Sequence, residues 1–177
     1  MVGYAFARKF PERVRGVLLL EAPLAGIEPW AELKCNPRVW HFGFHQTPNL
    51  PEKLLAGREY TYLREGFLTS EKISDADVRR YARAYAAPDH LRAGLGFYRA
   101  LPQSETQLDA LREPTEVPFV IAGADQVFGP LGEAIAAGLR ARGANRVQVE
   151  VIADSGHYVL DDQPERVAQL IETYAAP

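Results

Sequence analysis

Three residues with acid–base side chains each follow a predicted strand: Glu21, Asp125 and His157. Because the carboxyl ends of parallel strands meet at one edge of a sheet, we expect these side chains to lie close together there. A carboxylate that accepts a hydrogen bond from an imidazole fixes its tautomer, and the other ring nitrogen can then act as a general base near neutral pH. The sequence therefore predicts a base at His157, with either Glu21 or Asp125 as its relay acid.

Each of these residues also has a simpler interpretation when it is taken alone. His157 would be a surface histidine in a loop, and Glu21 a solvated carboxylate at a strand end. Asp125 would be a turn-forming residue that follows Gly123. Only their convergence at one sheet edge makes them a candidate site.

The elements that must position these residues alternate between strand and helix. Mainly apolar runs predict strands at residues 14–20, 118–122 and 147–152, in the pattern of parallel strands covered on both faces. Helical patterns occupy residues 1–10, 131–142 and 164–174. Helices that cross over between apolar strands predict an α/β fold with a parallel sheet.

The long segment between the first two strands has a different pattern. Residues 24–112 are rich in aromatic residues and prolines and contain no strand pattern. Helices are predicted there at roughly 50–69, 75–86 and 89–101. We therefore expect a core formed by residues 1–23 and 113–177, with a helical cap of residues 24–112 inserted after the first strand.

Composition narrows the classes of function. The chain has 177 residues with a formal net charge of −3 and no basic cluster, which argues against nucleic acid as a partner. No apolar run is long enough to cross a bilayer, so no membrane partner is expected. Cys35 is the single cysteine, which excludes an internal disulfide, and we expect it to be buried filler. The localisation is left unknown, with cytoplasmic as the default expectation, because no secretory leader is visible in this chain but an N-terminal half is expected to precede it.

The histidines do not indicate a metal. His41, His45, His90 and His157 lack the spacing of metal ligands, and the sequence has no glycine-rich phosphate loop. No cofactor and no metal are therefore expected.

Several motifs resemble the C-terminal part of an α/β-hydrolase of the epoxide hydrolase and dehalogenase branch, over nearly the whole chain. Residues 155–158 (SGHY) and 162–165 (DQPE) look like that family's catalytic-histidine motif. Residues 10–14 (FPERV) and 21–24 (EAPL) look like the helix and strand that follow its nucleophile elbow. The resemblance implies that the helical insertion is the family's cap.

The cap carries a more specific resemblance. Residues 40–44 (WHFGF), 55–59 (LAGRE) and 97–101 (FYRAL) are similar to the bacterial Cif-type epoxide hydrolases. In that group a cap histidine and a cap tyrosine hold the epoxide oxygen, and the matching motifs place these roles on His41 and Tyr98. The implied substrate is a small apolar epoxide, which reacts with water. A homodimer stays open as the assembly state.

The resemblance also bears on the relay acid and on competing activities. Cif-type enzymes take their relay acid from a strand-end Glu-Ala-Pro, which here is Glu21, whereas many relatives place theirs near Asp125. A dehalogenase of the same fold is the alternative activity. Fluoroacetate-dehalogenase-like caps have His-Trp where this chain has His41 and Phe42, and most other epoxide hydrolases have a cap tyrosine near Phe44. Both differences favour the epoxide hydrolase with a His–Tyr pair.

The chemistry of epoxide opening gives these residues a physical role. Attack by a carboxylate builds negative charge on the leaving oxygen, and donors placed there stabilise the transition state more than the ground state. We expect aromatic side chains to line a dry pocket around the reacting groups, although plain core packing is the alternative for each of them. These residues are Trp40, Phe42, Phe44 and Phe97.

The nucleophile of the resembled family is not found in the sequence. That family uses an Asp in a His-Asp-x-Gly turn, and neither this motif nor Gly-x-Ser-x-Gly occurs here. Cys35 has no strand-to-helix elbow around it and is a poor nucleophile. We therefore expect an N-terminal half with the nucleophile and the oxyanion hole to precede Met1, through a start assigned at an internal Met or a truncation. The 177 residues alone are expected to be inactive. The non-enzyme alternative is a fragment that folds only with a partner.

Overall fold

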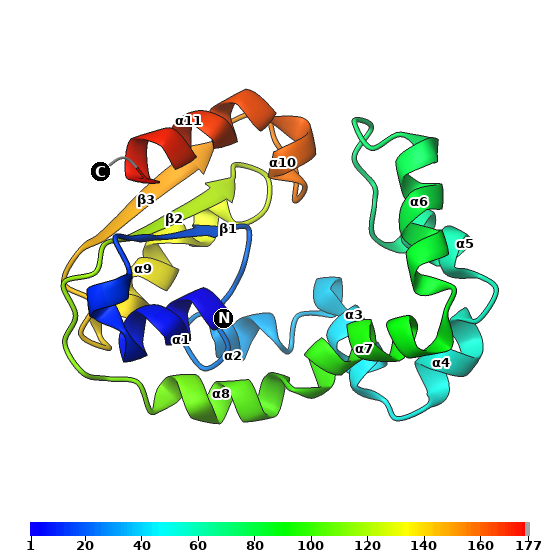
Figure 1. Ribbon diagram of the computed structural model, residues 1–177, viewed down its shortest axis with the longest axis horizontal. Helices are drawn as coiled ribbons and strands as arrows, with labels where there is room; N and C mark the ends of the chain where they lie inside the picture. The colour runs from blue at the N-terminus through cyan, green and yellow to red at the C-terminus, as the bar shows by residue number, and fades with distance from the viewer. Residues whose placement is uncertain (176–177) are drawn as a thin grey trace. The chain divides into compact units, whose positions relative to one another are not determined.

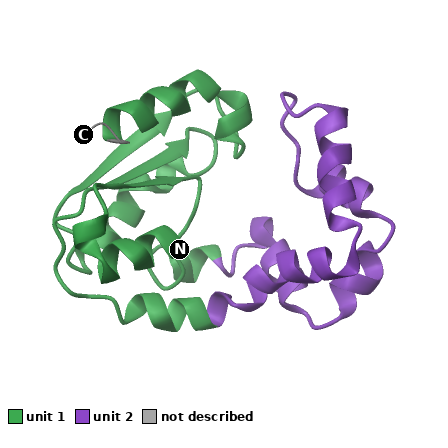
Figure 2. Cartoon of the chain, in the orientation of Figure 1, with its two compact units in different colours: residues 1–33, 103–177 green, residues 34–102 purple. Residues whose placement is uncertain are grey.

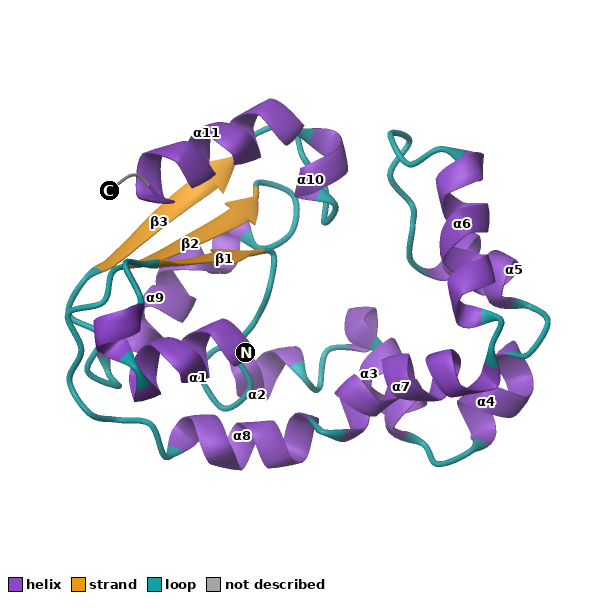
Figure 3. Ribbon diagram, in the orientation of Figure 1, coloured by secondary structure: helices purple, strands orange, loops and turns teal. Residues whose placement is uncertain are grey.

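The computed structural model describes residues 1–175, which form two compact units. Unit 1 contains residues 1–33 together with the chain from residue 103 onward, and unit 2 contains residues 34–102 (Figure 2). Unit 1 is an α/β structure, whereas unit 2 is built from helices (Figure 3). None of the described helices is both long and apolar enough to span a bilayer.

Unit 1 is organised around a parallel sheet of three strands. They are β1 (Val17–Leu20), β2 (Phe119–Ala124) and β3 (Val147–Ile152), in the order β1-β2-β3. Every residue of β2 is buried, because this strand has a neighbour on each edge and helices on both faces. All three strands run in the same direction, so their carboxyl ends lie at one edge, where Glu21, Asp125 and the loop of His157 begin.

Helices cover both faces of this sheet. Those of unit 1 are α1 (Val2–Lys9), α2 (Trp30–Leu33), most of α8 (Leu101–Asp109), α9 (Gly132–Arg140), α10 (Val159–Asp162) and α11 (Pro164–Ala175). Figure 1 shows α11 on one face and α1 and α9 on the other. Val167 and Leu170 of α11 pack with Ile152, while Tyr4 of α1 packs against Phe119 with ring centroids 5.7 Å apart. The predicted α/β class, with crossover helices between parallel strands, is confirmed.

The first strand is shorter than its apolar pattern predicted. The prediction began it at residue 14, but Pro11–Arg13 form a 3-10 turn and pairing with β2 begins at Val17. The strand can extend only as far as a partner strand offers backbone groups.

The boundary between the units also differs from the predicted cap of residues 24–112. Residues 24–33 and 103–112 belong to unit 1. Leu24 and Ile27 are fully buried there, and Gly138 of α9 lies so close that a Cβ on it would be 2.7 Å from the carbonyl oxygen of Glu28. Burial of these apolar residues against α9 explains why the segment packs with the sheet rather than with the other helices.

Unit 2 contains α3 (His41–Gln46), α4 (Leu50–Leu55), α5 (Glu59–Gly66), α6 (Asp75–Tyr85) and α7 (Pro88–Arg99). The prediction of one helix over 50–69 is wrong, because Gly57 adopts φ = +76° and separates α4 from α5. Pro88 opens α7, and Ser74 accepts a hydrogen bond from the Asp77 amide at the start of α6. Cys35, expected to be buried, is exposed in the turn after α2.

The core of unit 2 forms where α4 and α7 meet. Leu55, Leu91 and Leu95 are buried together, with Tyr62 and Phe44 packed against them. Beside this cluster, Arg99 of α7 pairs with Glu52 of α4 at 2.7 Å. The hydrogen bonds of this pair hold the pKa of the Glu52 carboxyl below its usual range. Apolar burial and one charged pair together fix α7 against α4.

Candidate active site

Glu21 is held rigidly at the carboxyl end of β1. Its backbone adopts φ = +46°, a left-handed conformation that turns the chain away from the sheet directly after the strand. One carboxylate oxygen accepts a hydrogen bond from the Ala124 amide at 2.5 Å, and the other lies 2.9 Å from Nδ1 of His157. Only 5% of the Glu21 side chain is exposed. The carboxylate is therefore fixed by the backbone of the neighbouring strand and directed at the imidazole.

His157 lies in the loop that follows β3. Its Nδ1 makes the hydrogen bond to Glu21, and 51% of its side chain is exposed. The ring is flanked by Phe128 and Tyr158, with centroids at 6.1 and 5.3 Å. When Nδ1–H donates to the carboxylate, the lone pair of Nε2 is left to accept a proton. This geometry is that of a general base oriented by an acid.

Asp125 has a different partner from the one that a relay acid needs. Its two carboxylate oxygens accept hydrogen bonds from the amides of Asp154 and Ser155, at 3.0 and 3.2 Å. A third backbone amide of the same loop, that of Gly156, donates to Asp162 at 2.9 Å. Asp125 and Asp162 thus shape the loop that carries the histidine. Of the two candidate acids, Glu21 is the one that contacts the imidazole.

The predicted donors of unit 2 lie beside one another on α3 and α7. The rings of His41 and Tyr98 are 5.7 Å apart and nearly perpendicular, and Phe42 contacts both of them. Burial, followed by the charge of Tyr85, raises the pKa of the Tyr98 phenol, so this group keeps its proton and can donate it. The structure therefore brings the His–Tyr pair together within unit 2.

The four aromatic residues predicted to line a substrate pocket are distributed differently. Phe42 contacts both rings of the pair, and Phe44 packs against the leucine core of unit 2. Trp40 is 49% exposed and Phe97 is 75% exposed. None of the four lines the pocket that unit 2 itself contains.

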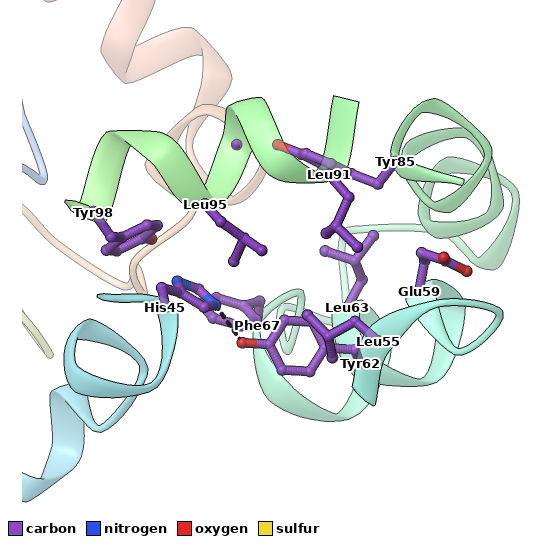
Figure 4. A pocket seen from close by; sticks show the side chains of 11 residues that line it. His45, Leu55, Glu59, Tyr62, Leu63, Phe67, Tyr85, Leu91, Leu95 and Tyr98 are labelled. Atoms are coloured by element: carbon purple, nitrogen blue, oxygen red, sulfur yellow. Dashed lines mark hydrogen bonds between the residues drawn. The ribbon is translucent and has the colours of Figure 1, made fainter. Parts of the chain in front are cut away.

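His45 and Tyr62 were missed as functional candidates. Nε2 of His45 lies 2.5 Å from the Tyr62 hydroxyl, and its ring centroid is 4.3 Å from that of Tyr98 (Figure 4). Burial, then the charges of His41 and Arg99, lower the pKa of His45 to about 4, so it is neutral at physiological pH. The sequence does contain a signal, because spacing of four residues from His41 puts both histidines on one face of a helix.

A metal centre finds no support among the described residues. No group of three or more His, Cys, Asp or Glu side chains is placed there so that it could hold a metal ion.

The sequence matches the alpha/beta hydrolase family over residues 1–170. Among solved structures, Cfl2 from Burkholderia cenocepacia is 33% identical, with a TM-score of 0.79 over 96% of this chain and 60% of that one. The epoxide hydrolase CorEH is 22% identical, with a TM-score of 0.82 over 99% of this chain and 64% of that one.

The Cif epoxide hydrolase from Acinetobacter nosocomialis is 16% identical, with a TM-score of 0.79 over 97% of this chain and 56% of that one. At these identities the two epoxide hydrolases establish the shared fold alone. The chain thus spans between 56% and 64% of the length of the three structures. No curated protein matches the sequence significantly.

Proposed function

Because the chain belongs to the alpha/beta hydrolase family, we propose that it carries the base, the relay acid and the oxygen-binding pair of an epoxide hydrolase. The observation that carries this proposal is the 2.9 Å hydrogen bond between Glu21 and His157 at the carboxyl end of the sheet. Family membership leaves the reaction open. The pair of Glu21 and His157 supports a reaction in which a water molecule must be activated. The resemblance of the cap motifs to Cif-type enzymes narrows the expected substrate to an epoxide.

The reaction has two steps. A carboxylate outside these 177 residues attacks an epoxide carbon, the C–O bond of the ring breaks, and an ester forms. His157 then takes a proton from water through Nε2 while the hydroxide adds to the ester carbonyl. The tetrahedral intermediate collapses to the free carboxylate and the diol. The ring oxygen has by then taken up one proton from a donor, and the proton held by His157 replaces it, so the net reaction adds one water to the epoxide. Glu21 stabilises the imidazolium that exists during this second step.

His41 and Tyr98 have the role of stabilising the leaving oxygen in the first step. A protonated phenol with a raised pKa is a hydrogen-bond donor that does not lose its proton to solvent at neutral pH. The adjacent imidazole supplies a second donor. Both donors act on charge that develops only as the ring opens, so they lower the barrier rather than merely binding the substrate.

The proposal can be tested with a chimaera that adds a nucleophile to these residues. The part of Cfl2 that this chain does not cover is joined to residues 1–177, and diol formation from styrene oxide is measured together with fluoride release from fluoroacetate. Diol formation without fluoride release is expected. His157→Gln should still form the ester but should not turn it over, so that intact-mass spectrometry finds the protein with one covalently bound substrate. His90→Gln, which changes an exposed histidine of α7, is the matched control and should turn over normally.

Two results would contradict the proposal. Fluoride release without diol formation would identify a dehalogenase of the same fold. Full turnover by the His157→Gln chimaera would remove the histidine from the reaction.

A further inference from the structure

The orientation of the Tyr98 phenol depends on ring contacts. Its hydroxyl makes no hydrogen bond to any of the described residues, and its ring packs against three side chains of α3. The ring centroids lie at 5.7 Å for His41, 5.6 Å for Phe42 and 4.3 Å for His45. The ring also borders a cavity of about 130 Å³ within unit 2 (Figure 4). A ring beside empty space keeps one orientation only if its remaining neighbours are themselves fixed.

His45 is the closest of these neighbours, and it is fixed from two further sides. Its Nε2 lies 2.5 Å from the Tyr62 hydroxyl of α5. Its ring stacks on that of Phe67, with centroids 5.6 Å apart and 16° between the planes. Only 5% of the residue is exposed. From its place on α3, the imidazole therefore connects Tyr62 to Tyr98 on α7 (Figure 4).

The hydrogen bond with Tyr62 determines which nitrogen of His45 carries the proton. Burial, then the charge of Tyr98, raise the pKa of the Tyr62 phenol, so this phenol keeps its proton and can donate it to Nε2. The imidazole is neutral, because burial above all lowers its pKa to about 4. When the phenol donates to Nε2, the neutral ring carries its own proton on Nδ1.

The Nδ1 atom of His45 is buried without a conventional partner. It makes no hydrogen bond to an oxygen or a nitrogen of the described residues. Phe67 lies nearly parallel to the imidazole and so covers its face, whereas the Tyr98 ring is inclined to it by 66° at a closer distance. An N–H group directed at an aromatic face forms a weak hydrogen bond, and steeply inclined aromatic pairs are favourable. The Tyr98 ring is therefore the partner that suits the Nδ1–H group.

We propose that His45 is a positioning residue for Tyr98. Tyr62 fixes the tautomer of His45, and the Nδ1–H group contacts the Tyr98 ring, so the phenol keeps the orientation in which it binds the leaving oxygen. This role in catalysis rests on the proposed function. His45 touches neither the substrate nor the base, so its loss should slow ring opening, in which Tyr98 acts, and should leave ester hydrolysis unchanged.

The contact itself can be tested by NMR in the full 177-residue chain. Two-bond nitrogen–proton spectra should show His45 as the Nδ1–H tautomer, with the Nδ1 proton shifted upfield by the Tyr98 ring. Tyr62→Phe removes the donor to Nε2, so the Nε2–H tautomer should appear and the Tyr98 ring signals should move. Tyr81→Phe, the same change at an exposed tyrosine of α6, should alter neither.

The consequence for the reaction is measured in the chimaera with Cfl2. Single-turnover ester formation from styrene oxide should slow by about ten- to a hundredfold in His45→Phe and Tyr62→Phe, the loss expected when a catalytic group is slightly misplaced. The affinity for styrene oxide and the rate of ester hydrolysis should not change. His90→Phe and Tyr81→Phe are the matched controls and should keep both rates.

Three results would overturn the positioning role. An Nε2–H tautomer of His45 in the unaltered chain would remove the contact, whether or not any variant folds. In an active chimaera, normal ester formation by both variants would contradict the role, and slowing of both steps by the same factor would indicate a general loss of structure. An unaltered chimaera that forms no ester contradicts the proposed function instead, and the NMR measurements then decide whether His45 fixes Tyr98.

Discussion

At the scale of single residues, the candidate site depends on how Glu21 is anchored. One oxygen of the carboxylate accepts a hydrogen bond from the Ala124 amide of β2, and the other contacts Nδ1 of His157. The backbone of β2 therefore positions the acid, and the acid positions the base. The left-handed backbone at Glu21 is part of this arrangement, because it turns the side chain toward the neighbouring strand's end.

Replacement of this carboxylate by an amide tests its role directly. Glu21→Gln preserves size and can still accept from Ala124, but it cannot stabilise an imidazolium. In the chimaera we expect ester hydrolysis to slow by about 10²- to 10⁴-fold, with little change in ester formation. Single-turnover measurements of both steps separate them. Equal slowing of the two steps would show that Glu21 only maintains the structure.

His45 should make the stability of the protein depend on pH. Its pKa is about 4 in the folded chain, against an ordinary value of 6.5, so below pH 6.5 the unfolded chain takes up a proton that the folded one does not. The contribution of His45 is therefore fully present above pH 6.5 and is lost as the pH falls toward 4. This pKa difference corresponds to at most about 3 kcal/mol.

Urea unfolding between pH 4 and pH 7.5 measures this loss. His45→Phe should flatten that part of the profile, whereas His90→Phe should not. His41 and Arg99 lie near the buried ring and are unchanged in both variants, so their effects cancel in the comparison. An unchanged profile in His45→Phe would mean that other groups cause the pH dependence.

At the scale of elements, glycines determine how closely the helices of unit 1 approach the segment before α2. Gly138 of α9 lies against Ile27 and Glu28, with the nearest backbone oxygen 2.7 Å from the place of a Cβ. The Asp109 carboxylate pairs with Arg142 at 2.8 Å beside the same segment, and Arg142 also donates to the Gly26 carbonyl. Because of this packing, the first part of unit 1 extends to residue 33 and not only to residue 23 as predicted, and the segment packs within unit 1.

Two glycine-to-alanine changes within helices should act in opposite directions. Gly138→Ala introduces a methyl group where no space exists, and we expect it to lower the free energy of unfolding by about 1–3 kcal/mol. Gly96→Ala in α7 has no atom within 4 Å of the new methyl group and should raise it by about 0.5–1 kcal/mol. Denaturant titration of both variants provides the comparison. A neutral Gly138→Ala would show that α9 can move away from this segment.

At the scale of the whole molecule, local patterns predicted the sheet and the position of His157 at its carboxyl edge, whereas the choice of Glu21 over Asp125 as the relay acid depended on the family resemblance. Apolar runs followed by Glu21 and by the loop of His157 are visible without coordinates, and parallel pairing brings them together. The break at Gly57 and the unit boundary at residue 33 depend on tertiary packing and on a left-handed backbone that composition does not reveal. His45 was missed because its burial against Tyr62 and Tyr98 arises only when three helices meet.

The last prediction concerns the free edge of the sheet. β1 pairs with β2 alone among the described residues, and its amides alternate in direction. The amides of Val17 and Glu21 donate to β2, so those of Leu18 and Leu20 point away from it. In dilute solution we expect these two amides to exchange hydrogen at least about 10²-fold faster than that of Leu19, because fully protected amides exchange only when the strand unfolds.

Hydrogen-exchange mass spectrometry or NMR at several protein concentrations distinguishes the possible states of this edge. Protection of Leu18 and Leu20 that increases with concentration would mean that a second copy of the chain pairs with β1, as exposed edges tend to do. Protection equal to that of Leu19 in a dilute monomer would contradict the prediction, because it would require another segment of the same chain to cover the edge.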